Sequence, residues 1–318
     1  MKVGCQNKTA KSLWPFLLRH GVRNICSSAP AGPRGYWEVD TLRKLRADAD
    51  AAGISVDALM HGGLYQCVEI GDVRRRAIER VQGAIRTAGE AGFGCMLYAI
   101  PISTVPFSTG SVRGRGGVLC RKWSLEQVRA EPEKIRKNIL STDEMWERLT
   151  YLLERIVPVA AEYKVRLACH PQDPPAPPEL GRGTSAALGT VEGVKRFLAI
   201  CENPCHGLCF CQGTFSEMLE KPGETIYDVI RYFGRRKKIF NVHFRNIRGG
   251  RNEFAETFPD EGDVDMSRAL QVYQEVGYDG MLMPDHVPSH PDDPQALQGF
   301  AFCYGYINGL IQALKTTV

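Results

Sequence analysis

The sequence predicts a parallel (β/α)8 barrel, because eight short apolar runs alternate with longer stretches of helical periodicity over its 318 residues. A chain of this length is normal for one such barrel. A doubly wound open sheet has the same alternation and is the alternative. Neither a repeat nor a low-complexity linker divides the sequence, so we expect residues 1–318 to form a single barrel domain.

The first half of the sequence supplies four of the strands. Between them, residues 37–52 carry apolar side chains three or four positions apart, beginning at Val39, and Gly53 ends this helix. We expect strands at residues 2–5, 24–28, 54–59 and 93–100, and helices at residues 11–19, 37–52 and 72–91.

Residues 101–139 interrupt the alternation with one long irregular insertion. The segment is rich in glycine, serine, arginine and proline, and its glycines match no phosphate-binding or dinucleotide-binding spacing. A stretch of this length inside a compact chain is usually functional or mobile. We therefore interpret it as a lid or as an arm that contacts another subunit.

The second half completes the barrel with four more strands. The helix at residues 142–163 is expected in spite of Pro158, and Asp265 precedes a later helix. We expect strands at residues 165–170, 206–211, 238–245 and 279–285, and helices at residues 142–163, 190–201, 225–233, 266–276 and 295–314.

Composition excludes several classes of protein. The formal charge of +4 is small for this length and gives no indication of a nucleic-acid partner. The eleven cysteines are scattered and several lie in apolar runs, which favours buried thiols in a reducing compartment. The first residues resemble a strand rather than a targeting segment, and no apolar run approaches the ~20 residues of a membrane span. We expect a cytoplasmic protein with no membrane partner.

Four predicted strands end on residues that bind divalent metals: His170, Cys211, His243 and Asp285. Alternate residues of a barrel strand face the interior, and the last inward residue lies at the carboxyl-terminal mouth. Counting by twos allows all four side chains to converge there, whereas Cys209 lies deeper and is interpreted as core. Two imidazoles, a thiolate and a carboxylate suit Mn, Fe, Co or Zn, and the softness of these ligands favours zinc. The alternative for each is a structural polar residue.

Five short motifs around these positions resemble the mannonate dehydratase family. They are CHPQDPP at 169–175, FCQGTF at 210–215, VHFRNI at 242–247, FPDEGDVDM at 258–266 and MPDH at 283–286. The resemblance implies a xylose-isomerase-like barrel that removes water from D-mannonate to give 2-keto-3-deoxy-D-gluconate. It also implies a divalent metal, most often Mn, on His170, Cys211, His243 and Asp285.

The resemblance assigns further roles. His286 is similar to the family's acid/base histidine, and Arg245 and Asn246 are expected to hold the substrate carboxylate or hydroxyls. Asp173 and Asp260 are further expected substrate ligands. The family places an active-site tyrosine after the last strand, where this sequence has Phe300, with Tyr304 and Tyr306 a turn further on. We expect Tyr304 to be the catalytic tyrosine. The alternative is that Phe300 fills this place, so that a proton donor is missing and the reaction differs or fails.

The amino-terminal half departs from the family. YAIPIST at 98–104 stands where the family has an Asn-Phe-Met-Pro segment. We therefore expect a sugar-acid dehydratase of hexuronate catabolism, with two alternatives. The first is an isomerase or epimerase on the same barrel, and the second is a non-catalytic homologue that binds sugar acids. A homo-oligomer, dimer or tetramer, is also expected.

Overall fold

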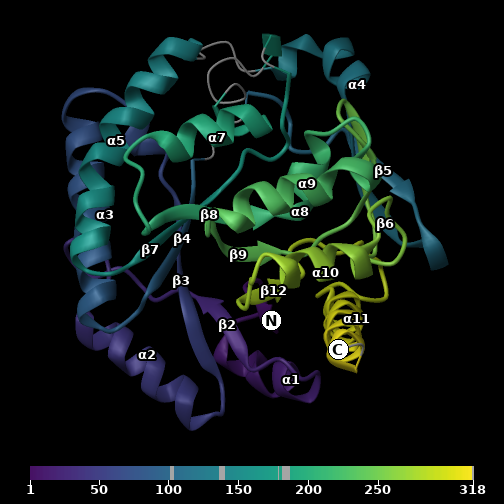
Figure 1. The fold of residues 1–318 in the computed structure, drawn as a ribbon, viewed down its shortest axis with the longest axis horizontal. Coiled ribbons are helices and arrows are strands. Elements are labelled where there is room, and N and C mark those ends of the chain that lie inside the picture. The colour runs from purple at the N-terminus through teal and green to yellow at the C-terminus, as the bar shows by residue number, and fades with distance from the viewer. Residues whose placement is uncertain (101–103, 136–139, 178, 181–186, 317–318) are drawn as a thin grey trace.

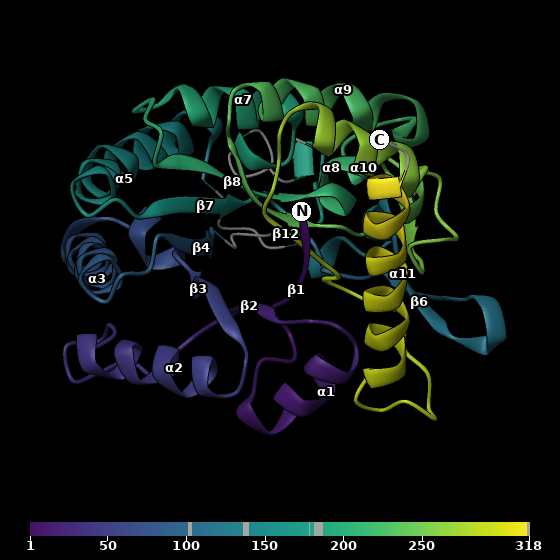
Figure 2. The same ribbon diagram turned by 60° about the horizontal axis from the view of Figure 1, so that its bottom comes forward.

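Eight parallel strands close into the barrel that the sequence predicts (Figures 1 and 2). The computed structural model describes residues 1–100, 104–135, 140–177, 179–180 and 187–316. Going round the barrel, the strands follow chain order, and the last pairs with the first. The barrel strands are β1 (Lys2–Cys5), β2 (Asn24–Ser27), β3 (Ser55–Gly63), β4 (Cys95–Ala99), β7 (Arg166–His170), β8 (His206–Cys211), β9 (Ile239–His243) and β12 (Met281–Met283).

Helices surround the barrel on its outer side (Figure 1). Helix α5 (Thr142–Glu162) begins with a capping box, in which Ser141 accepts from the Glu144 backbone and Glu144 accepts from that of Ser141. The described helices are α1 (Trp14–Arg19), α2 (Val39–Ala51), α3 (Gly71–Glu90), α4 (Leu125–Ala130), α5 (Thr142–Glu162), α7 (Val191–Ala199), α8 (Gln212–Glu217), α9 (Pro222–Arg235), α10 (Met266–Glu275) and α11 (Leu297–Thr316). Pro158 lies inside α5, as expected.

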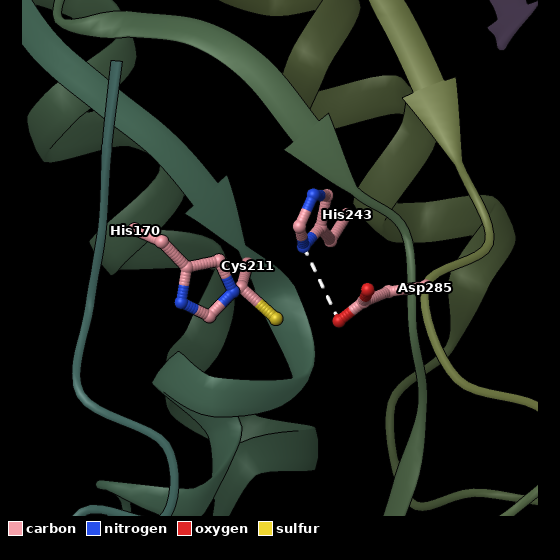
Figure 3. A group of neighbouring side chains, drawn as sticks. All are labelled: His170, Cys211, His243 and Asp285. Carbon is pink, nitrogen blue, oxygen red and sulfur yellow. Dashed lines mark ion pairs between the residues drawn. The ribbon is translucent and has the colours of Figure 1, made fainter. Parts of the chain in front are cut away.

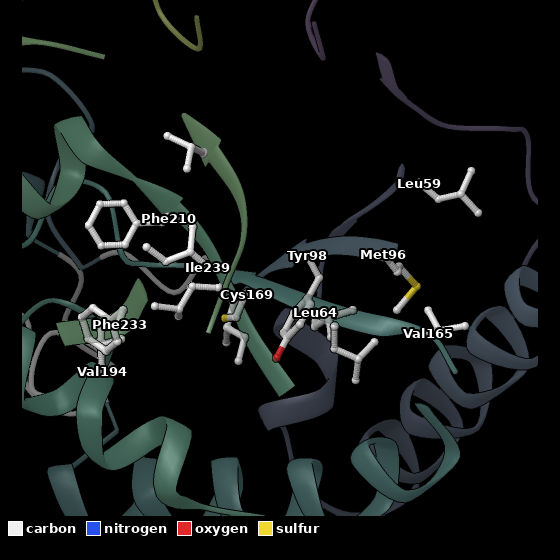
Figure 4. Packing of buried hydrophobic residues seen from close by; sticks show 14 of the residues in the cluster. Leu59, Leu64, Met96, Tyr98, Val165, Cys169, Val194, Phe210, Phe233 and Ile239 are labelled. Atoms are coloured by element: carbon white, nitrogen blue, oxygen red, sulfur yellow. The ribbon is translucent and has the colours of Figure 1, made fainter. Parts of the chain in front are cut away.

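The apolar residues form an inner and an outer layer. On β7, Ala168 packs inside the barrel, whereas Leu167 and Cys169 pack outward against the helices. Figure 4 shows Cys169 in this outer layer beside Phe210 and Ile239. This alternation confirms the counting by twos. It brings Arg166 and His170 to the same inward face as Ala168, with His170 at the carboxyl end.

The prediction of an irregular insertion at 101–139 is wrong for much of its described part. Residues in β5 (Gly110–Arg113) and β6 (Leu119–Ser124) form an antiparallel hairpin. It joins a second hairpin, β10 (Ile247–Gly250) and β11 (Glu253–Glu256), in a four-stranded sheet. Residues 101–103 and 136–139 lie outside the described residues. Whether the insertion serves as a lid or a subunit contact stays a prediction.

All eleven cysteines lie in the described part of the chain and are free thiols. Most are buried, as expected from their apolar surroundings. Within the described ranges, every helix is too short or too polar to cross a lipid bilayer.

His206 should make folding stability depend on pH. It is fully buried at the start of β8, where its Nε2 lies 3.2 Å from the Phe197 carbonyl oxygen. Burial lowers the pKa of His206 to about 4, below the value of about 6.5 in an unfolded chain. The unfolded state therefore binds more protons between these values. The contribution of neutral His206 to the free energy of unfolding is present above pH 6.5. This contribution, about 3 kcal/mol, is lost as the pH falls toward 4.

Urea unfolding of wild type and His206→Gln at several pH values between 7 and 4 measures this effect. The difference in unfolding free energy between the two proteins should shift in favour of the variant as the pH falls. A difference that stays constant with pH would contradict the assignment.

Candidate active site

The four strand-end residues converge at the carboxyl-terminal mouth of the barrel (Figure 3). His170, Cys211 and His243 end β7, β8 and β9, and Asp285 follows β12 by two residues. One donor atom from each lies within 4.8 Å of every other. His243, Asp285 and Cys211 are buried, and His170 is partly buried. The geometry therefore allows the four residues to share one cation.

Hydrogen bonds orient the two imidazoles. His170 directs Nδ1 to the Pro171 carbonyl oxygen at 2.7 Å, which leaves Nε2 for the pocket. His243 has Gln6 Oε1 at 2.8 Å from Nε2 and Cys209 Sγ at 3.2 Å from the same atom. Its Nδ1 is buried, lies 3.3 Å from Asp285 Oδ2 and has no hydrogen-bond partner among the described residues. Such outer contacts fix which nitrogen faces a metal.

Residues after β1 hold the carboxylate. Gln6 donates to Asp285 Oδ1 at 2.9 Å, and Asn7 donates to the Asp285 backbone carbonyl. Neither residue is among those predicted from the sequence, although both also follow a barrel strand. The available signal was the polar Gln-Asn pair directly after Cys5.

The surroundings of Cys211 stabilise a thiolate. Its Sγ accepts from the Thr214 backbone N–H at 3.4 Å, at the start of α8, and from Arg245 at 3.5 Å. Burial opposes ionisation of the thiol, but the Arg245 charge and hydrogen bonds from His170 and His243 lower the pKa of Cys211 well below its usual value. The sulfur therefore points at charged groups and not into packed hydrocarbon.

The charges of this cluster favour a cation. Burial disfavours a charged imidazole, yet the neighbouring Cys211 raises the pKa of His170 to about 9. Asp285 similarly raises the pKa of His243 well above its usual value, against the effect of burial. The negative charges of Cys211 and Asp285 thus stabilise protons on the two imidazoles. The imidazole nitrogens are also the atoms where a metal would bind. An N/S/O donor set with this charge fits a divalent transition metal.

Beside the cluster lies a buried network of two arginines and three carboxylates. Arg245 contacts Asp173 Oδ2 at 2.8 Å and Glu217 Oε1 at 3.0 Å, and it also pairs with Glu256. Arg121, from β6, contacts Asp173 Oδ1 at 3.1 Å and Glu256 Oε1 at 2.8 Å. Burial and the charge of Asp173 raise the pKa of Glu217 to about 7, so the third carboxylate is only partly ionised. Arg121, Glu217 and Glu256 are not among the residues predicted from the sequence.

This network changes the expectation for Arg245. Its side chain is only 1% exposed, and the protein's own carboxylates occupy the guanidinium. We therefore interpret Arg245 as a residue that positions Asp173 and Glu256 and not as a direct substrate ligand. Asp173 does line the pocket, and its other oxygen pairs with Arg121.

His286 lies between the cluster and the network. Its Nδ1 is 2.5 Å from Glu256 Oε1, and its Nε2 is 3.5 Å from Asp285 Oδ2. The Phe107 ring meets the imidazole edge-on, with centroids 5.7 Å apart. Together with His170, His243, Asp173 and Asp285, His286 lines a pocket of about 300 Å³. His286 therefore faces the same space as three of the four donors, His170, His243 and Asp285.

Three expected site residues lie elsewhere. Tyr304 is fully buried among core residues and lines none of this pocket, and Phe300 packs 6.0 Å from it between ring centroids. The side-chain amide of Asn246 already donates hydrogen bonds to the backbone carbonyl oxygens of Pro259 and Val264. Asp260 pairs with Arg115 at 2.6 Å and also lies outside the pocket lining. None of the three residues lines this pocket, so the catalytic role of Tyr304 and the substrate contacts of Asn246 and Asp260 stay predictions that its lining does not support.

Removing the buried Arg245 charge should destabilise the protein. Arg245→Met leaves Asp173, Glu217 and Glu256 short of a counter-ion, which costs about 3–5 kcal/mol when a buried pair is broken from one side. Arg121→Met is the matched control, because Arg121 contacts the same three carboxylates and is 11% exposed. Urea unfolding should show the larger loss for Arg245→Met. Equal or negligible losses would contradict the network's importance.

Comparison with known proteins identifies the family. A family model described as D-mannonate dehydratase (UxuA) matches residues 120–318. The mannonate dehydratase of Thermotoga petrophila is 26% identical over 303 residues, covering 84% of this chain and 81% of the relative. That of Endomicrobium trichonymphae is 27% identical over 313 residues, with 86% and 84% covered.

Solved structures share the fold. The mannonate dehydratase from Streptococcus suis serotype 2 superposes with a TM-score of 0.81 at 24% identity, over 98% of this chain and 94% of that one. A xylose isomerase domain protein from Planctomyces limnophilus gives 0.61 at 16% identity, over 99% and 98%. The matched residues 120–318 contain the four converging donors, Arg245 and His286. The chain therefore belongs to the mannonate dehydratase family, which is a family of hydro-lyases.

Proposed function

We propose that this chain dehydrates a sugar acid, D-mannonate first, to 2-keto-3-deoxy-D-gluconate and water. The observation that carries the proposal is the convergence of four potential metal ligands beside a pocket that His286 lines together with three of them, His170, His243 and Asp285. All five residues lie in the part of the chain that matches the family model. The pocket volume of about 300 Å³ is at the lower end of the usual range for small-molecule sites, which suits a single hexonate.

The cofactor we propose is a divalent metal, with Mn first and Fe, Co or Zn as alternatives. His170 Nε2, Cys211 Sγ, His243 Nδ1 and an Asp285 oxygen would hold it. When bound, such an ion supplies positive charge that stabilises the negative charge developing on the substrate during proton removal. The hydrogen bonds from Gln6 and Asn7 hold the carboxylate ligand in place.

His286 is proposed to move the protons. Burial lowers its pKa, so the imidazole is neutral at neutral pH. Its Nδ1 faces Glu256, which favours the tautomer with the proton on Nδ1 and leaves the Nε2 lone pair as the base. The proton next to the substrate carboxylate, at C2, is the acidic one.

His286 alone can carry out both proton transfers of the dehydration. Nε2 takes the C2 proton, the C2–C3 double bond forms, and the C3–O bond breaks. The imidazolium delivers its proton to the departing hydroxyl, which leaves as water. The enol then becomes the ketone by moving its hydroxyl proton to C3. Because Tyr304 lies in the core, the proposal needs no tyrosine.

His286→Asn tests the catalytic assignment. We expect turnover of D-mannonate by the metal-loaded protein to fall by about 10²–10⁴-fold, the usual contribution of an acid/base group. The metal content should stay unchanged, since the four donors remain. A colorimetric assay for 2-keto-3-deoxy acid and elemental analysis give the two readouts. Absence of keto-deoxy acid with the wild-type protein would overturn the dehydratase proposal and leave the isomerase and binding-protein alternatives.

His243→Ala tests the metal assignment. Loss of one donor should weaken metal binding by more than about 100-fold, because even outer-shell changes cost 10–100-fold. Metal titration and elemental analysis measure this directly. Tyr304→Phe is the control and should keep both metal content and turnover. A His243→Ala protein with full metal occupancy would show that the donor set is wrong.

A further inference from the structure

A second cavity of about 350 Å³ adjoins the catalytic pocket and has no role in the proposed reaction. It lies at the ends of β2 and β3, which pair side by side in the barrel (Figure 2). Met60 and Gly62 line both spaces. The two cavities are therefore neighbours that share one wall.

A bulge in β3 creates this wall. The pairing of β3 with β4 shifts between Met60 and Gly62, so His61 is the extra residue. Bulges re-aim side chains at barrel rims, and His61 lines the second cavity but not the catalytic pocket. Gly62 has a φ of +92°, and a Cβ at that position would meet nothing within 4 Å. No side chain therefore closes the wall between the two cavities at Gly62.

The lining indicates a neutral ligand with both apolar and hydroxyl surfaces. In the described part of the chain, no Asp, Glu, Lys or Arg lines this cavity. Tyr36 and Trp37 supply aromatic rings, and the Trp37 indole N–H is already used by the Ala29 carbonyl at 2.9 Å. Sugar rings combine C–H faces, which pack on aromatic rings, with hydroxyls, which need hydrogen-bond partners.

His61 offers the partner that such hydroxyls need. Its ring meets Trp37 edge-on at 5.6 Å between centroids. Its Nδ1 is buried and has no hydrogen-bond partner among the described residues. Leaving a buried polar atom unpaired costs about 1–3 kcal/mol, so a bound hydroxyl would recover that loss. Burial lowers the pKa of His61 to about 4, and the neutral ring offers one donor and one acceptor.

We propose that this second cavity binds a glycosyl unit attached to the sugar acid, so that the substrate class includes glycosylated hexonates. The inference rests on the proposed function and extends its substrate. The hexonate occupies the catalytic pocket, and the attached sugar crosses Met60 and Gly62 to pack on Trp37 and hydrogen-bond to His61. The reaction at C2 and C3 leaves a sugar on O4 in place. The cavity residues precede residue 120, so they lie outside the region matched by the family model.

The test compares D-mannonate with mannobionate, the 4-O-mannosyl derivative of mannonate. Calorimetry measures binding to the metal-loaded protein, and the keto-deoxy acid assay measures turnover. Wild type should bind mannobionate about tenfold more tightly than D-mannonate, as one or two extra hydrogen bonds and ring packing allow.

Two variants locate the effect. His61→Ala removes the polar partner, and Ala31→Trp fills the cavity from its exposed rim without touching the core. Each should weaken mannobionate binding about tenfold and leave D-mannonate binding within twofold. Equal effects on both ligands, or wild-type binding of mannobionate weaker than that of D-mannonate, would overturn the inference.

The outcomes also separate this inference from the proposed function. If D-mannonate is dehydrated but mannobionate does not bind, only the glycosyl site is overturned. If mannobionate binds in a His61-dependent way but neither acid is dehydrated, the glycosyl site stands and the dehydratase proposal is overturned.

Discussion

The buried guanidinium of Arg245 is the interaction on which the site depends. A guanidinium keeps its charge at any pH that a folded protein meets, so it is a permanent cation inside the barrel mouth. Four acidic groups surround it: the Cys211 thiol and the carboxyl groups of Asp173, Glu217 and Glu256. Each of these groups would be costly to bury alone. The cluster of metal-binding residues and the carboxylate network are therefore one electrostatic unit.

The second sheet brings the outer half of this unit to the barrel. Arg121 lies on β6 and Glu256 on β11, and the two strands pair antiparallel. Glu256 in turn holds His286, which follows the last barrel strand. The four converging donors thus lie on or beside barrel strands, whereas His286, the proposed acid/base residue, is held by a residue of the second sheet. A change in the hairpin of β5 and β6 would in this way reach His286 without touching the four donors.

The two sides of the mouth differ in chemistry. The side formed by β8, β9 and β12 is dense in charge and lies in the region matched by the family model. The side formed by β2 and β3 is uncharged and aromatic and lies outside that region. This division agrees with the sequence, in which the family motifs cluster in the second half and the first half departs from them. In the proposed function, the second half carries the reaction and the first half shapes what can enter.

The sequence by itself determined the eight barrel strands, their parallel order and the four converging donors. These follow from local geometry, because alternation along a strand decides which side chains face inward and strand ends of a parallel barrel meet at one mouth. Only the tertiary structure decided that Gln6 supports Asp285, that Arg121 meets Glu256, and that Tyr304 is buried away from the pocket. These contacts join residues far apart in the chain, and Arg121 and Glu256, which are 135 residues apart, meet through strand pairing. Local periodicity carries no information about such pairing or about how buried charges balance one another, which is why the outer half of the site emerged only from the fold.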